Sequence, residues 1–203
     1  MGMSYVCSWQ RTIPKRRIEK KLKSFRFNWG LTKNKMVSKK MEAALNAQMN
    51  AEMYSGYLYL AMSAYFEEEE LPGFAHWMRI QAAEELEHGL KFFDYILRRN
   101  AHVSIEKIDK PETSWEDAKA VFEQVSQHEK NVTGMINELV DLAISEKDHA
   151  TNNFLQWFVA EQVEEEENAD GILGQVKRAI GSPTTLLLLD GELANRPAAG
   201  SSE

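Results

Sequence analysis

Four glutamates interrupt long apolar stripes of helical spacing, one in each of four segments of the chain. Glu52, Glu85, Glu129 and Glu165 each stand in a series of mostly apolar residues that steps by three or four positions, so each lies on the buried face of a helix. A buried carboxylate is unfavourable unless it is paired or binds a cation. Four such carboxylates meeting in one place predict a polynuclear metal site.

Three further side chains on these stripes extend the candidate site. His88 follows Glu85 by three positions, so both project from one helix face, one turn apart. A carboxylate-rich set with a single imidazole favours a hard or borderline cation such as iron, manganese or zinc and disfavours a dedicated copper site. Tyr59 is expected to hydrogen-bond a ligand, with Glu129 as one choice, or to supply an electron. Neutral Gln162 is expected to orient a ligand or a bound oxygen species.

Four long helices are needed to bring these side chains together. The periodicity predicts helices over residues 38–70, 72–100, 114–147 and 151–180, followed by a short fifth helix over 184–193. Ser38 is the expected N-cap of the first helix, Pro72 suits the first turn of the second, and Thr113 or Ser114 is the expected cap of the third. The four glutamates lie near the helix midpoints, so a bundle would place them at one level.

The connections between these helices predict the topology. Residues 101–112 have no helical period, contain Pro111 and are long enough to run from one end of a bundle to the other. Two closely joined helices, a long connection and two more closely joined helices are typical of an all-α four-helix bundle with one long crossover.

Composition narrows the class of protein. With 203 residues and 43% hydrophobic content, the chain can bury one sizeable core as a single domain. The lone cysteine, Cys7, excludes an intrachain disulfide framework and a cysteine-based metal cluster. No apolar run approaches the roughly 18–20 residues needed to span a bilayer. A soluble, cytoplasmic protein without a membrane partner is therefore expected.

Charge divides the chain into two parts. Residues 1–35 hold ten Lys or Arg and one acid, whereas the remainder carries a net charge of −16 within the total of −7. The acidic part, residues 36–194, is the expected folded domain; it attracts cations and repels nucleic acid.

Three interpretations of the basic leader, residues 1–35, stay open. Met36 is the native start and the leader is not native, the leader is a disordered arm that contacts nucleic acid or the acidic domain, or it is an organelle-targeting peptide. Residues 195–203 are expected to be a disordered tail.

Four segments of the chain resemble the signature stretches of bacterial and archaeal non-haem ferritins. They are NAEMYSGYLYL (Asn50–Leu60), EELEH (Glu84–His88), HEKNVTGMINEL (His128–Leu139) and NFLQWFVAEQVEEE (Asn153–Glu166). The resemblance covers Met36 to Leu193 in order and in spacing. It implies a ferritin-like four-helix bundle with a short C-terminal helix.

The resemblance also implies a ferroxidase centre that binds two irons per subunit. Its ligands would be Glu52, Glu85 and His88 for one iron and Glu85, Glu129 and Glu165 for the other. A third iron position, frequent in the family, maps onto Glu84, Glu161, Glu164 and Glu165. Haem-bearing relatives carry Glu-x-x-His where this chain has Gln162-x-x-Glu165, which indicates the branch without haem.

The function that the resemblance implies is iron storage with ferroxidase activity. Fe(II) would be oxidised by O2 or peroxide and stored as ferric oxyhydroxide in a homo-oligomeric shell of 24 subunits, with residues 184–193 at its four-fold contacts. A non-storage di-iron peroxidase or redox bundle is the main alternative, although such peroxidases usually carry a Cys-rich electron-transfer module that this chain lacks. A shell subunit that only nucleates mineral and a DNA-protecting mini-ferritin are further alternatives.

Overall fold

The computed structural model describes residues 36–197, and within this range the regular structure is entirely helical. The five helices are α2 (Lys39–Glu68), α3 (Pro72–Arg98), α4 (Ala118–Ser145), α5 (His149–Ala179) and α6 (Pro183–Leu193). None of the described helices is long and apolar enough to cross a membrane. The basic leader and residues 198–203 of the expected tail lie outside the described residues.

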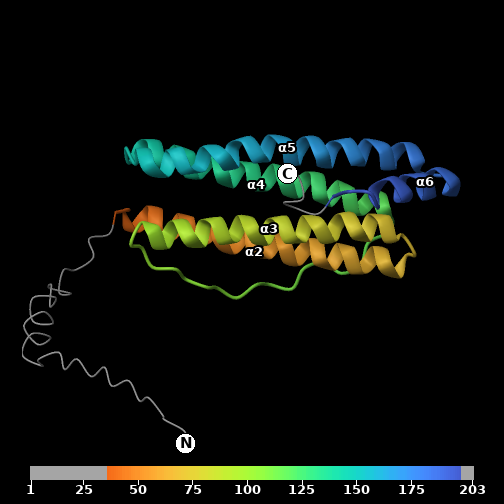
Figure 1. Ribbon diagram of the computed structural model, residues 1–203, viewed down its shortest axis with the longest axis horizontal. Helices are drawn as coiled ribbons and strands as arrows, with labels where there is room; N and C mark the ends of the chain where they lie inside the picture. The colour runs from red at the N-terminus through yellow and green to blue at the C-terminus, as the bar shows by residue number, and fades with distance from the viewer. Residues whose placement is uncertain (1–35, 198–203) are drawn as a thin grey trace, which may run out of the picture. The chain divides into compact units, whose positions relative to one another are not determined.

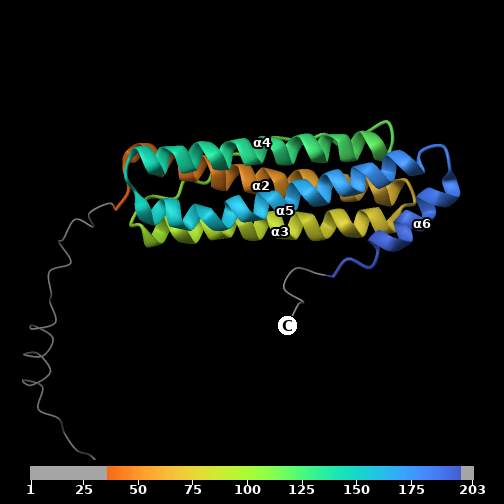
Figure 2. The same cartoon turned by 90° about the horizontal axis from the view of Figure 1, so that it is seen from above.

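The four long helices form a bundle of two helical pairs (Figures 1 and 2). α2 packs along α3 and α4 packs along α5, while the segment between α3 and α4 runs the length of the bundle. The short helix α6 lies at the end where α2 passes into α3 and contacts α3 and α5. The predicted all-α bundle with one long crossover and a short fifth helix is confirmed.

Two asparagines on α2 hold the crossover against the bundle. The side-chain amide of Asn46 donates to the carbonyl oxygen of His102 at 2.8 Å and accepts from the amide of Ser104 at 2.6 Å. One turn later, Asn50 donates to Ser104 O at 2.9 Å and accepts from the amide of Glu106 at 2.9 Å. These bonds satisfy backbone groups of a segment that has no secondary structure of its own.

Two of the predicted helix starts are confirmed. The hydroxyl of Ser38 accepts a hydrogen bond from the amide of Met41 at 2.9 Å and caps α2. Pro72 occupies the first turn of α3, where its missing amide hydrogen leaves no bond unmade.

The predicted start of the third helix is wrong. α4 begins at Ala118 because Asp117, in extended conformation, is its N-cap and accepts from the amide of Ala120 at 2.8 Å. The preceding Trp115 packs edge-on against Tyr65, with ring centroids 5.2 Å apart. Its indole also donates to Gln124 Oε1 at 2.5 Å. The packing of this partly buried tryptophan outside the helix outweighs the capping propensity of Thr113 and Ser114.

Two apolar clusters fill the bundle on either side of a polar layer. The cluster towards α6 is built on Met62, Phe66, Phe74, Met78, Phe122 and Val176. The cluster at the opposite end is built on Met41, Leu45, Met49, Phe92, Ile136 and Phe158. Each fully buried large side chain contributes about 1.5–3 kcal/mol to stability, so the two clusters hold the four helices at the level of the polar layer.

The helix α6 completes the first turn of α3. Leu71, the N-cap residue of α3, has no side chain that can accept a hydrogen bond. The carboxylate of Asp190 on α6 takes this role, accepting from the amides of Gly73 at 2.8 Å and Phe74 at 3.0 Å. A Cβ at position 73 would lie 1.8 Å from the carbonyl oxygen of Asp190, so only glycine allows this approach.

Candidate metal centre

A first group of candidate ligands joins α2 and α3. Glu52, Glu85 and His88 are all buried, and each offers one ligand atom within 4.8 Å of those of the other two. The close approach of the two helices rests on Gly56, whose Cβ would lie 3.1 Å from both Ala82 O and Leu86 Cγ if it had one. Two carboxylates and an imidazole at this separation suit a divalent cation such as iron.

A second group joins α3 and α5. His88, Glu161 and Glu165 also offer ligand atoms that lie within 4.8 Å of one another. The Nδ1 atom of His88 lies 3.7 Å from Glu85 Oε2 and its Nε2 atom lies 3.8 Å from Glu161 Oε1. The imidazole therefore belongs to both groups, with Nδ1 towards Glu85 and Nε2 towards Glu161.

Glu129, from α4, belongs to neither group of close ligand atoms. Its buried carboxylate accepts a hydrogen bond from the hydroxyl of Tyr59. The side-chain amide of Gln162 lies 3.4 Å from Glu129 Oε2 and 3.3 Å from Thr133 Oγ1. Tyr59 and Gln162 thus both contact Glu129. Burial is the main cause that raises the pKa of Glu85, and the charge of Glu129 is the next, so Glu129 lies close to the first group.

Two buried glutamines that the sequence analysis did not single out also donate to the carboxylates. Gln81 is fully buried; its Nε2 donates to Glu165 Oε2 at 2.8 Å and, more weakly, to Glu85 Oε1 at 3.4 Å. Gln48 donates to Glu52 Oε1 at 2.8 Å. Each glutamine precedes a glutamate of the centre by four positions on the same stripe, and this Gln-x-x-x-Glu spacing is the sequence signal that could have identified them.

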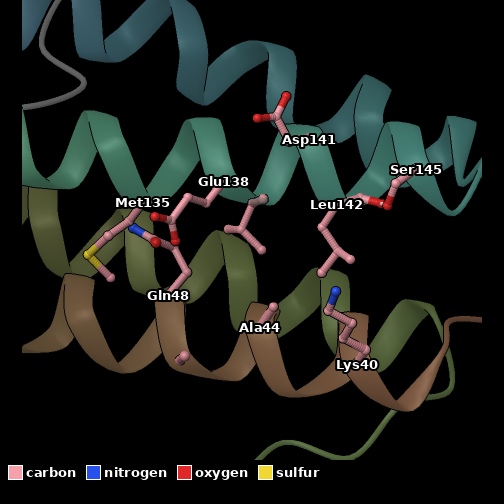
Figure 3. A pocket seen from close by; sticks show the side chains of 10 residues that line it. Lys40, Ala44, Gln48, Met135, Glu138, Asp141, Leu142 and Ser145 are labelled. Atoms are coloured by element: carbon pink, nitrogen blue, oxygen red, sulfur yellow. The ribbon is translucent and has the colours of Figure 1, made fainter.

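Gln48 also lines an outer cavity between α2 and α4 (Figure 3). The cavity has a volume of about 570 Å³, and Glu138 and Asp141 line it together with apolar side chains of both helices. None of the candidate metal ligands lines this cavity. The cavity is therefore separate from the candidate metal centre, and the side chain of Gln48, which donates a hydrogen bond to Glu52, lies between the two.

The carboxylates of the centre hold protons more tightly than ordinary glutamates. Burial, and next the charge of Glu85, raises the pKa of Glu52 well above its usual value of 4.5, and burial does the same for Glu85. For Glu165, burial and the nearby charge of Glu129 raise the pKa to about 7. A cation that binds here replaces these protons and removes the repulsion, so the donor set fits divalent cations.

A half-buried histidine supports the tyrosine of the centre. His128 Nε2 lies 2.8 Å from the hydroxyl oxygen of Ser55, and its ring stands edge-on to Tyr59 with centroids 6.1 Å apart. Burial lowers the pKa of His128 to about 4, so the imidazole is neutral at physiological pH. Sequence reasoning gave His128 no role, because its partner is fixed only by the packing of α4 on α2.

The four glutamates expected to form a third iron position have different surroundings. Glu161 and Glu165 lie with His88 in the second group. Glu84 forms an ion pair with Arg196, which follows α6. Glu164 is exposed.

Comparison with known proteins adds four findings. A family model for the ferritin-like domain matches residues 42–179. A bacterial non-heme ferritin of Bacteroides fragilis is 45% identical over 161 residues, 79% of this chain and 100% of the relative. One from Staphylococcus epidermidis is 39% identical over 79% of this chain and 97% of the relative. The crystal structure of an open pore ferritin from Archaeoglobus fulgidus aligns with a TM-score of 0.79 and 48% identity, covering 79% of this chain and 99% of that one.

Proposed function

Because the chain belongs to the ferritin family, we propose that it takes up Fe(II), oxidises it and stores the ferric product within a homo-oligomeric shell of 24 subunits. Iron is the substrate and the cargo of this reaction. The family assignment and the ferritin neighbours support iron storage and do not favour a non-storage redox bundle.

One observation carries the ferroxidase part of the proposal. Four helices each contribute a buried glutamate to one polar layer, and His88 joins them. Glu52, Glu85 and His88 would hold one Fe(II), and Glu85, Glu129 and Glu165 would hold the second. Four carboxylates neutralise the four positive charges of two Fe(II) ions, and they bind Fe(III) more strongly still, which favours oxidation.

The side chains around the proposed ligands orient the carboxylates through hydrogen bonds. Gln48 and Gln81 donate to the carboxylates and hold them in place, and Gln162 and Tyr59 do so for Glu129. The carboxylates release their protons when Fe(II) binds, because only the charged oxygen is a good ligand. Two Fe(II) ions then give one electron each to O2, which takes up two protons and becomes hydrogen peroxide. With peroxide as the oxidant, the same two electrons and two protons yield two water molecules.

A third iron position completes the proposal. Glu161 and Glu165, which lie beside His88, would supply its inner ligands, and Glu84 and Glu164 its outer ones. Iron at this position would lie next to the pair and outside it.

Aerobic addition of Fe(II) to the purified, metal-free protein tests the proposed function. Ferric absorbance is followed against a protein-free blank, and the product is then passed over a sizing column with iron measured in each fraction. Fast oxidation with iron that co-elutes with a large shell is the expected result. Fast oxidation on a small particle without retained iron would show a redox bundle instead, and no acceleration over the blank would contradict ferroxidase activity.

A further inference from the structure

Arg196, three residues beyond α6, contacts three successive turns of α3. Its Nη1 donates to Gln81 Oε1 at 2.9 Å and to the carbonyl oxygen of Trp77 at 3.4 Å, and its Nη2 forms the ion pair with Glu84. The guanidinium carbon lies 4.5 Å from the centroid of the Trp77 ring. The carbonyl oxygen of Arg196 lies 3.0 Å from His76 Nε2. Both ends of the residue are thus held on α3.

The chain reaches this position through α6. Asp190 ties α6 to the first turn of α3, and hydrogen bonds from the amides of Asn195 and Arg196 to Glu192 O and Leu193 O, at 3.1 and 3.2 Å, continue the turn beyond the helix. Asn195 and Arg196 belong to the segment for which the sequence predicts a disordered tail. Arg196 packs against the face of α3 that carries Gln81 and, one turn further, Glu85.

Gln81 stands between two kinds of partner that together fix its orientation. A guanidinium only donates hydrogen bonds, and a carboxylate that has released its proton to bind a metal only accepts them. With Arg196 on one side of the amide and Glu165 and Glu85 on the other, Oε1 must face the arginine and Nε2 must face the carboxylates. The reverse orientation would set the amide oxygen against two carboxylates and the amide hydrogens against the guanidinium.

We propose that Arg196 is a positioning residue of the iron site, acting through Gln81: its guanidinium orients the Gln81 amide, which in turn holds the carboxylates of Glu165 and Glu85. This inference rests on the proposed function, because it concerns the same centre. It gives the end of α6 a role in the geometry of the ligands in addition to its role in packing. The guanidinium of Arg196 touches neither Glu85 nor Glu165 directly. Its hydrogen bonds go to Trp77, Gln81 and Glu84, and Glu84 belongs to the proposed third position, not to the iron pair.

Four variants of the full chain, each checked by sizing for assembly, test the proposal. They are Arg196→Ala, Arg196→Lys, Gln81→Leu and the double variant Arg196→Ala/Gln81→Leu. Arg79→Ala is the matched control, because Arg79 also lies on α3 and forms an ion pair, with Glu67, but is 65% exposed and outside the centre. The kcat and KM for Fe(II) oxidation are measured, together with the visible absorption spectrum of the Co(II)-loaded protein under anaerobic conditions, which reports on ligand geometry without turnover.

The expected result for Arg196→Ala is a fall in kcat of about five-fold, the order of change for one lost hydrogen bond, with a smaller change in KM. The Co(II) spectrum should shift to that of Gln81→Leu, and the double variant should be no worse than Gln81→Leu alone, because residues that act through one another are not additive. Arg196→Lys, which keeps a donor for Gln81 Oε1, should recover most of the rate and the parent spectrum. Arg79→Ala should match the parent.

Two outcomes would overturn the inference. One is a Co(II) spectrum of Arg196→Ala identical to that of the parent. The other is additive losses in the double variant, which would show that Arg196 and Gln81 act independently. A parent protein that fails to oxidise Fe(II) would instead contradict the proposed function, and the Co(II) spectra would still report on the contact between Arg196 and Gln81.

Discussion

The hydroxyl of Tyr59 on α2 donates a hydrogen bond to the carboxylate of Glu129 on α4, across the middle of the bundle. A second bond, from Gln81 on α3 to Glu165 on α5, ties the other two helices at the same level. The polar layer therefore links both helical pairs and is stabilised by the apolar clusters on either side. Stability and metal binding are coupled here, because the side chains that hold the helices together also hold the candidate ligands.

Replacing Tyr59 with phenylalanine should weaken this link. Tyr59 is almost completely buried, so Glu129 would lose a donor that water cannot replace, at a cost of about 1–3 kcal/mol. For a chain of this size the unfolding temperature of the metal-free protein should fall by about 2–4 °C per kcal/mol. Differential scanning calorimetry measures the change. Tyr57→Phe, at a side chain that is 49% exposed, is the control and should leave the unfolding temperature unchanged; equal effects of the two variants would contradict the role given to Tyr59.

The stability of the metal-free protein should fall as the pH rises. The pKa of Glu165 is raised from 4.5 to about 7, so the folded state binds the proton more tightly than the unfolded state does. Its stabilising contribution is fully present below pH 4.5 and is lost as the pH rises through 7, a change of about 3 kcal/mol at most. Raised pKa values of Glu52 and Glu85 add to it in the same direction. The lowered pKa of His128 acts in the opposite direction below about pH 6.5, and the three carboxyls together outweigh this single group.

Thermal unfolding at pH 5 and pH 8 measures this dependence. The metal-free protein should unfold at the higher temperature at pH 5, and saturating Co(II) should reverse the order, because the metal binds the deprotonated ligands of the folded state. Glu165→Gln, which cannot ionise, should reduce the difference between the two pH values. A parent protein that is more stable at pH 8 without metal would show that these carboxyls are not proton-bound as the structure implies.

Asp190→Ala should loosen α6 and destabilise the bundle. The variant leaves the amides of Gly73 and Phe74 without their acceptor and removes a negative charge from the N-terminus of α3. Loss of an N-cap carboxylate reduces stability by about 0.5–2 kcal/mol. Thermal unfolding of Asp190→Ala is compared with Glu192→Ala, at an exposed position on the same helix. Indistinguishable unfolding temperatures would mean that Asp190 is dispensable as a cap.

The sequence predicted those features that repeat with a regular period. The four buried glutamates and His88 are visible because each departs from an apolar stripe, and Ser38 and Pro72 mark helix starts by local chemistry. The start of α4 could not be predicted from capping residues alone. Trp115 packs on Tyr65 outside the helix, so α4 begins at Ala118 and not after Thr113 or Ser114.

Three supporting side chains could not be predicted, because their partners lie far away in the chain. Asp190 caps a helix that begins 118 residues earlier, Arg196 reaches Gln81 over 115 residues, and His128 meets Ser55 over 73. Each contact depends on how one helix packs on another, which periodicity does not specify. Gln48 and Gln81 could be predicted only in part. Their four-residue spacing from Glu52 and Glu85 is visible in the sequence, but the role of a buried glutamine can be assigned only when its hydrogen-bond partners are known.

The central claim is that the buried carboxylates bind two Fe(II) ions for oxidation, and titration of the fast oxidation phase tests it most directly. Fe(II) is added to the metal-free shell in increasing ratios, and the amplitude of the fast rise in ferric absorbance is measured by stopped-flow for the parent and for Glu85→Ala. Glu85 is the shared ligand of the proposed pair, so the variant should assemble into the same shell but lack the fast phase. In the parent, the amplitude should saturate at about two Fe(II) per subunit, the stoichiometry of a two-metal site. A variant that retains the parent rate and amplitude would contradict the assignment of the centre.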